Sequence, residues 1–97
     1  MKKTKKYKDH LFKVLKDPDE RAAYLNAALE EDPESFFLAL KDVTDACGGV
    51  SKLAKKSSLN REALYKTLST KGNPRFASLL SMLHALGLDV YIQSASA

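Results

Sequence analysis

Five polar side chains between residues 60 and 66 carry groups that could bond to DNA bases or phosphates: Asn60, Arg61, Glu62, Tyr65 and Lys66. An arginine can donate two hydrogen bonds to O6 and N7 of guanine, and a glutamate can accept one from N4 of cytosine. Arg61 and Glu62 are therefore candidate base contacts. Tyr65 either stacks on a sugar edge or covers the core.

Several of these residues also have a purely structural interpretation. Asn60 can cap the helix that follows it, and a side-chain oxygen that accepts from backbone N–H groups cannot also read a base freely. Arg61 can pair with Glu62 at the surface. The neighbouring cations are better treated as phosphate contacts, although a solvated helix face also carries lysines. The candidates for phosphate contacts are Lys55, Lys56, Lys66, Lys71 and Arg75, and Ser58 joins them as a candidate DNA contact.

The spacing from Gly49 to Leu68 predicts two helices that would position these side chains. Leu53 falls in the first helix, where the small Ala54 lets the second helix pack closely. Residues 57–59 make the turn. This is the spacing of a helix-turn-helix, in which the second helix lies across a DNA major groove. The apolar face of the second helix consists of Ala63, Leu64 and Leu68.

Charge is unevenly distributed along the 97 residues, which suffice for one domain with a modest core. Residues 1–16 hold seven lysines and one aspartate, for a net charge of +6. Residues 17–47 carry −7 and residues 48–97 carry +5, within a total of +4. This asymmetry favours two kinds of partner: an anion such as nucleic acid for the basic parts, and something basic for the acidic block.

Local signals predict further helices. Residues 9–15 form a short docking helix after a flexible basic arm over residues 1–8. Asp17-Pro18 and Asp32-Pro33 each open a helix, Pro74 allows another to start, and Gly87 ends it. The helix that starts at Asp17-Pro18 is predicted to bury Ala23, Tyr24, Ala27 and Ala28 with Leu25 and Leu29. The helix that starts at Asp32-Pro33 is predicted to bury Phe36, Phe37, Leu40, Val43 and Ala46. The helix after Pro74 is predicted to bury Phe76, Leu79, Leu80, Leu83 and Leu86.

Residues 88–93 alternate between apolar and polar side chains, which predicts one β-strand. A lone strand has no partner within a helical chain, so it would pair with a second copy of itself. The alternatives are pairing with the N-terminal segment of its own chain, or an apolar tail lying on the core. The predicted fold is therefore all-α: a dimeric five-helix domain over residues 9–97, with an N-terminal helical extension and one C-terminal β-strand. The predicted dimer interface consists of Leu88, Val90, Tyr91 and Ile92.

Other chemistries find little support in the sequence. His10 and His84 lie in different predicted helices, no Cys/His set has metal-ligand spacing, and no Gly-rich phosphate loop occurs. We therefore expect neither an enzyme nor a cofactor. Cys47 is expected to be a small core residue. No apolar run approaches a membrane span and the start lacks a signal peptide's apolar segment, so a cytoplasmic protein without membrane contact is expected.

Three segments together resemble a known family. DPDERAAYLNAALEEDPESFFLALKDV, GGVSKLAKKSSLNREALYKTLSTKGNP and LLSMLHALGLDVYI look like the addiction-module antidote proteins, HigA-like antitoxins of the Xre (lambda-repressor-like) helix-turn-helix superfamily. The similarity covers residues 11–92, and LYKTLS followed by KGNP is its most specific part. The resemblance implies a dimeric repressor that binds its own operator DNA and neutralises a RelE/ParE-like toxin from the neighbouring gene.

The resemblance also bears on individual residues. Many Xre proteins carry a phosphate-contacting Gln where this chain has Val50, so the role is assigned to Ser51 and Lys52, whose backbone N–H groups lie at the same helix end. A toxin that acts on RNA needs a cationic surface, which acids could cover. The candidate toxin-binding residues are Glu20, Glu30, Glu31 and Glu34. The alternative is that the acids only stabilise helix N-termini, which does not suit Glu30 and Glu31.

Two other functions remain open. The chain could be a free-standing Cro-like prophage regulator, or a protein-interaction module in which the helix-turn-helix serves only as a scaffold. The cations between Lys52 and Arg75 favour DNA binding.

Overall fold

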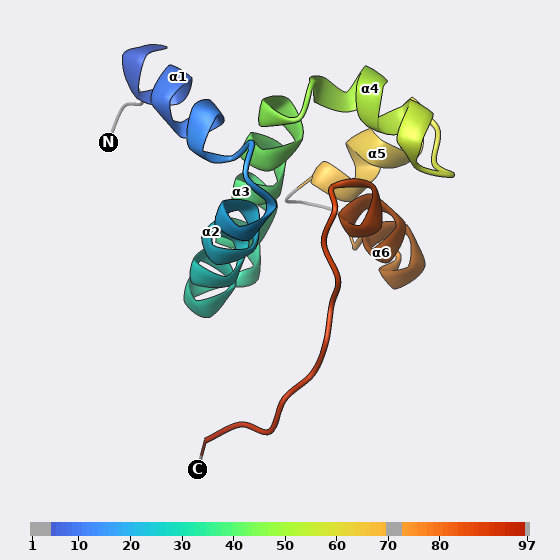
Figure 1. Cartoon of the computed structure of the whole chain (residues 1–97). Helices are drawn as coiled ribbons and strands as arrows, with labels where there is room; N and C mark the ends of the chain where they lie inside the picture. The colour runs from blue at the N-terminus through green and yellow to red at the C-terminus, as the bar shows by residue number, and fades with distance from the viewer. Residues whose placement is uncertain (1–4, 70–72, 97) are drawn as a thin grey trace.

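The structure is a computed structural model that describes residues 5–69 and 73–96, and this part of the chain contains six α-helices (Figure 1). Within the described residues, none of the helices has the length and apolarity that a bilayer crossing requires. The prediction of an all-α fold is confirmed, but the prediction of five helices with a C-terminal strand is wrong. The helices are α1 (Lys5–Val14), α2 (Pro18–Glu31), α3 (Pro33–Ala46), α4 (Gly49–Lys56), α5 (Arg61–Leu68) and α6 (Phe76–Ala85).

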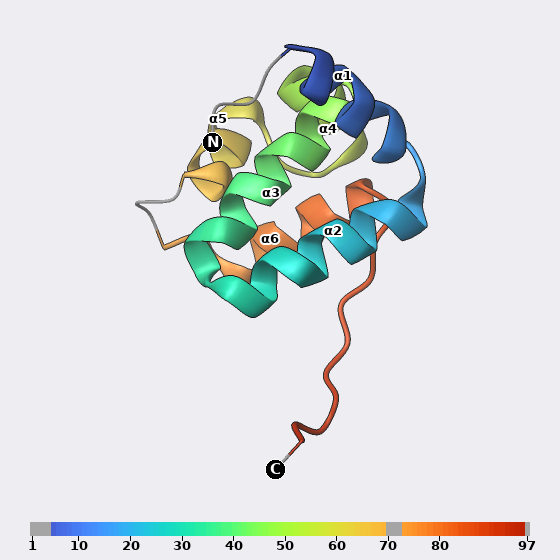
Figure 2. The same cartoon turned by 90° about the vertical axis from the view of Figure 1, so that its left-hand side faces the viewer.

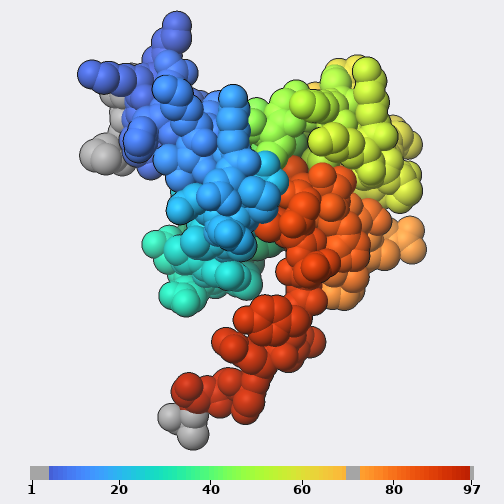
Figure 3. Space-filling model, viewed as in Figure 1, coloured from blue at the N-terminus to red at the C-terminus, as the bar shows by residue number. Residues whose placement is uncertain are grey.

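The segment predicted as a strand instead forms an extended tail, residues 88–96, without regular secondary structure. It leaves the helical body after α6 and projects away from it (Figures 1 and 3). A strand requires a neighbour that supplies ladder hydrogen bonds. Among the described residues at the N-terminus, Lys5–Val14 cannot supply them, because these residues form the helix α1. The prediction of a tail on the core holds only for Leu88, which packs against the core while residues 89–96 are exposed.

The predicted helix starts at the two Asp-Pro pairs are confirmed. The Asp17 side chain accepts a hydrogen bond from the Asp19 N–H at 2.9 Å and Pro18 is the first residue of α2. The Asp32 side chain accepts one from the Ser35 N–H at 2.6 Å. This bond stabilises the ionised carboxylate and lowers the pKa of Asp32 below its ordinary value. Both helices therefore begin where local capping chemistry directs.

The end of α6 was also predicted from a local signal. Gly87 has φ of 80°, a left-handed conformation that glycine adopts without steric cost. The Gly87 N–H donates to the His84 carbonyl at 3.0 Å and the Leu88 N–H to the Leu83 carbonyl at 2.9 Å. These two bonds make a Schellman motif, which stops the helix and turns the chain into the tail.

α3 lies at the centre of the fold and contacts α1, α2, α4 and α5 (Figure 2). Leu40 and Val43 of α3 are completely buried, as is the Thr44 side chain, whose hydroxyl donates to the Leu40 carbonyl at 2.8 Å. The other buried apolar residues are Leu11, Leu15, Leu25, Ala39, Leu53, Leu64, Met82, Leu83 and Leu86.

Two details of the predicted core are wrong. α2 buries Leu25, whereas Ala23, Ala27 and Leu29 are exposed. The reason is that α2 packs mainly against α3, so only the side chains on the face towards α3 are covered. α6 buries Met82, whereas Phe76 at its first position is 66% exposed. The apolar pattern alone does not reveal which part of an apolar face meets a neighbour.

α1 begins earlier than the predicted helix over residues 9–15. Residues Lys5–Lys8, predicted to belong to a flexible arm, form the exposed start of α1. The remainder of that arm, residues 1–4, lies outside the described residues.

Arg21 links distant parts of the chain, and no sequence pattern predicted this role. Its guanidinium donates to the Leu15 carbonyl at 2.7 Å, to the Lys16 carbonyl at 3.0 Å and to the Leu86 carbonyl at 2.8 Å. The α1–α2 connection and the end of α6 are thereby attached to the first half of α2.

Candidate nucleic-acid interface

α4 and α5 form the pair of short helices predicted from the spacing of residues 49–68. Leu53 and Leu64 are buried in the core, and Ala54 packs against it. In the connection, the Ser57 hydroxyl oxygen accepts from the Leu59 N–H at 3.2 Å, and the Leu59 side chain turns back onto the core. The core therefore holds α5 through one face and leaves its polar face towards solvent.

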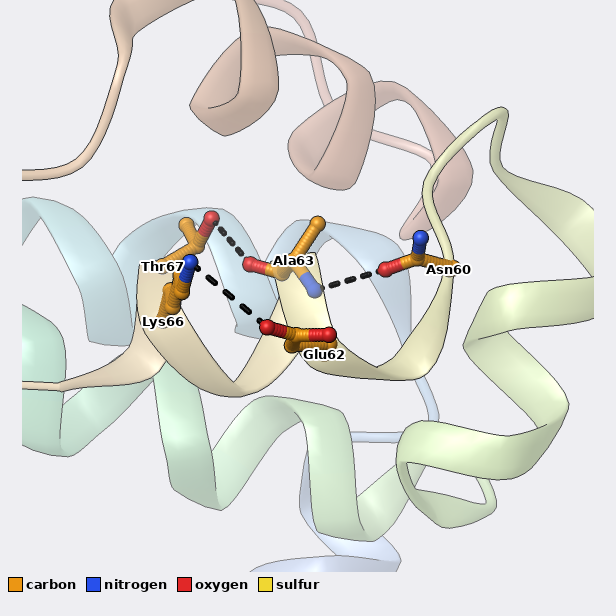
Figure 4. Close-up of polar contacts among 5 residues, drawn as sticks. All are labelled: Asn60, Glu62, Ala63, Lys66 and Thr67. Carbon is orange, nitrogen blue, oxygen red and sulfur yellow. Dashed lines mark hydrogen bonds and ion pairs between the residues drawn. The ribbon is translucent and has the colours of Figure 1, made fainter.

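Asn60 acts as the N-cap of α5. Its Oδ1 accepts from the Ala63 N–H at 2.8 Å, and the Thr67 hydroxyl donates to the Ala63 carbonyl at 2.9 Å (Figure 4). The capping interpretation of Asn60 is therefore confirmed. Because its side-chain oxygen already has a partner, base reading would fall to residues further along α5.

Arg61 and Glu62 lie in the exposed first turn of α5. Glu62 pairs with Lys66 at 3.7 Å, one helical turn later, rather than with Arg61 (Figure 4). The side chains of this pair are 79% and 78% exposed, and an exposed pair of this spacing contributes only about 0.3–0.5 kcal/mol. Lys66 can therefore exchange Glu62 for a phosphate at small cost.

A hollow of about 400 Å³ lies where the end of α3, the start of α4 and α5 meet. It brings Ser51 and Tyr65 to one place, although they are on different helices. The first N–H groups of a helix lack intrahelical acceptors and favour an anion. Lys41 on the wall adds to this preference and Asp45 opposes it.

Of the remaining candidate DNA contacts, those that the structure describes lie on α4, in the connection to α5 and at the start of α6. Lys52, Lys55 and Lys56 are exposed on α4, and Ser58 is exposed in the connection between the helices. Arg75 is exposed at the N-cap position of α6, where its side chain makes no capping bond. Lys71 lies outside the described residues.

The four candidate toxin-binding glutamates are exposed on α2 and α3. Glu20 and Glu34 are in the first turns of their helices, where an acid stabilises the helix dipole. Glu30 and Glu31 end α2, where the same dipole disfavours acids. α2 lies on the side of α3 that is away from α5 (Figures 1 and 2). The helix pair with Arg61 and the acidic end of α2 therefore occupy different sides of the fold.

The candidate dimer residues divide into two groups. Leu88 packs on the chain's own core, whereas Val90, Tyr91 and Ile92 are 48%, 80% and 95% exposed. Three large apolar side chains in contact with water on a short tail cost free energy that a partner surface would recover.

Tyr24 of α2 and Asp42 of α3 form a polar pair that was not predicted from the sequence. The Tyr24 hydroxyl donates to the Asp42 carboxylate at 2.7 Å, and the pKa of Tyr24 is raised, first by burial and then by this carboxylate. A second hollow lies beside the pair, and Leu38 on its wall is 55% exposed. The i, i+4 spacing of Leu38 and Asp42 places both on one face of α3, but it does not indicate which residue of α2 lies opposite them.

Comparison with known proteins relates the chain to one family. Residues 5–94 match the family model described as "Probable addiction module antidote protein". A protein of Haemophilus influenzae (strain Rd), described as uncharacterized, is 38% identical over 82 residues, which cover 84% of each chain. No solved structure was found to match. Since the family model spans almost the whole sequence, this chain belongs to the family of probable addiction module antidote proteins.

Proposed function

We propose that this protein is a HigA-like antitoxin with an Xre-type helix-turn-helix, which binds operator DNA as a homodimer and neutralises a RelE/ParE-like toxin. It acts by binding and not by catalysis. The observation that carries the proposal is the exposed polar face of α5, with Arg61 in its first turn and the lysines of α4 beside it. Membership of the antidote family favours an antitoxin over a free-standing regulator.

In this proposal, α5 lies in the major groove and Arg61 reads a guanine. The N-terminus of α4 and the lysines nearby contact phosphates, which hold α5 in register. Recognition helices of a two-fold dimer lie roughly 34–36 Å apart, so the operator should be a near-palindrome.

Replacing Arg61 by alanine tests whether this residue contacts a base of the operator. We expect specific operator binding to weaken by about 1–3 kcal/mol, while binding to unrelated DNA changes little, because a bidentate contact to guanine discriminates between bases. Lys66→Ala is the matched variant: it should weaken binding to all sequences alike and reduce the salt dependence. Gel-shift titrations with DNA from upstream of the gene, at several salt concentrations, measure both effects. An unchanged operator affinity in Arg61→Ala would contradict the proposed role of Arg61.

In the proposed homodimer, Val90, Tyr91 and Ile92 of the tail pack against a second copy of the chain. We expect Ile92→Asp to shift the protein from dimer to monomer, because a charged aspartate would replace the exposed isoleucine in the interface. Operator binding should then fall too, since two linked half-sites become two weak ones. Ser94→Asp adds the same charge to the same tail and should stay dimeric. Light scattering at micromolar concentration compares the two, and a dimeric Ile92→Asp protein would refute this interface.

Toxin binding is assigned to the acidic side of the molecule. Glu30 and Glu31 carry this part of the proposal, because helix stabilisation does not account for acids at the end of α2. A protein that acts on RNA needs a cationic surface, and the −7 charge of residues 17–47 complements such a surface.

A further inference from the structure

The second hollow, of about 280 Å³, opens between α2 and α3. These two helices pack side by side along their length (Figures 1 and 2). Ala27 and Ala28 of α2 and Leu38 of α3 give the hollow apolar walls. The two charged residues on its walls, Glu31 and Asp42, are both acids. Apolar walls and acidic groups are thus combined in one small space.

The acids on its walls are not equivalent. Asp42 is held by the Tyr24 hydroxyl at 2.7 Å, which fixes its carboxylate at the wall, and a carboxylate can accept several hydrogen bonds at once. Glu31 is exposed at the end of α2. An incoming donor therefore meets one fixed acid and one adaptable acid.

The size of the hollow restricts what it can hold. Sites for drug-sized molecules span roughly 300–1,000 Å³, so this space suits a single long side chain better than a free ligand. Lysine and arginine combine an aliphatic stem with a cationic head. The stem can pack on Leu38 and the alanines while the head bonds to Glu31 and Asp42.

We propose that the hollow between α2 and α3 is the anchor point for the toxin and receives one arginine or lysine side chain from it. This inference rests on the proposed function, and it assigns toxin binding to Leu38, Asp42 and Glu31 rather than to the acidic block as a whole. Charge complementarity between the −7 block and a cationic partner brings the two proteins together. Leu38 and the hollow then determine which part of the antitoxin surface the toxin binds.

The chain offers two matched pairs of variants that isolate the hollow. Leu38 and Leu29 are both 55% exposed, but only Leu38 lines the hollow. Glu31 and Glu30 are neighbours at the end of α2, but only Glu31 lines it. Leu38→Arg and Leu29→Arg add the same charge, and Glu31→Lys and Glu30→Lys reverse the same charge. Overall electrostatics therefore change equally within each pair.

The probe is the protein encoded by the adjacent gene, bound to the full-length chain and measured by calorimetry. We expect Leu38→Arg to weaken binding by about 10- to 100-fold, as for the loss of an interface hot spot, and Leu29→Arg by only a few-fold. Glu31→Lys should likewise weaken binding more than Glu30→Lys. Circular dichroism and operator binding should stay unchanged in all four variants, because none of these residues lies on α4 or α5.

The outcomes separate the two proposals. If the two members of both pairs weaken toxin binding equally, the toxin responds to overall charge and the anchor at the hollow is refuted, while the proposed function stands. If the wild-type chain does not bind the adjacent gene's product at all, the proposed function fails and the anchor fails with it. A selective effect of Leu38→Arg and Glu31→Lys supports the anchor.

Discussion

Replacing Leu64 by alanine is expected to lower the free energy of unfolding by about 2–5 kcal/mol, the range for a leucine removed from a packed core. Leu64 is completely buried and attaches α5 to the core. The substitution should also reduce operator affinity in proportion to the fraction of unfolded or loosened protein, because the packing of Leu64 on the core holds α5 in position. Denaturant unfolding measured by circular dichroism gives the change directly.

Leu29→Ala is the control for this experiment. It removes the same atoms from a helical leucine that is 55% exposed, so its effect should stay within about 0.5 kcal/mol. Leu64→Met keeps most of the volume and should cost less than about 1.5 kcal/mol. Equal effects of Leu64→Ala and Leu29→Ala would show that α5 is not held by the core as described.

Replacing Arg21 by alanine is expected to lower the free energy of unfolding by about 2–4 kcal/mol. A hydrogen bond to a charged group contributes about 1.5–3 kcal/mol, and bonds that share one guanidinium are not additive. The variant leaves the carbonyls of Leu15, Lys16 and Leu86 without their donor. Thermal or denaturant unfolding at neutral pH measures the loss.

Two further variants show whether the geometry of Arg21 is responsible. Arg21→Lys retains the charge, but a single ammonium cannot reach three separate carbonyls as the planar guanidinium does, so only a minor part of the stability should return. Arg75→Ala removes an exposed arginine and should change stability by less than about 0.5 kcal/mol. Full recovery in Arg21→Lys would mean that charge alone, and not the three bonds, stabilises this junction.

The sequence by itself determined the features that depend on near neighbours. Asp17 and Asp32 cap their helices as their positions indicate, and Asn60 adopts one of the two roles that the sequence left open for it, since a cap needs only an N–H group two or three residues away. Gly87 ends α6 because the left-handed residue and its acceptors lie within one turn. The Gly49–Leu68 spacing likewise predicted the two short helices and the burial of Leu64. These signals are local, so no tertiary structure is needed to interpret them.

Tertiary structure alone decided the features that join distant residues. Arg21 bonds to Leu86, 65 positions away, and nothing near either residue indicates the pairing. The hollow requires α2 and α3 to lie side by side, which gives Glu31 a different environment from Glu30. Residues 88–93 alternate like a strand but form an exposed tail, because a pattern of side chains cannot supply the neighbouring backbone that a strand requires.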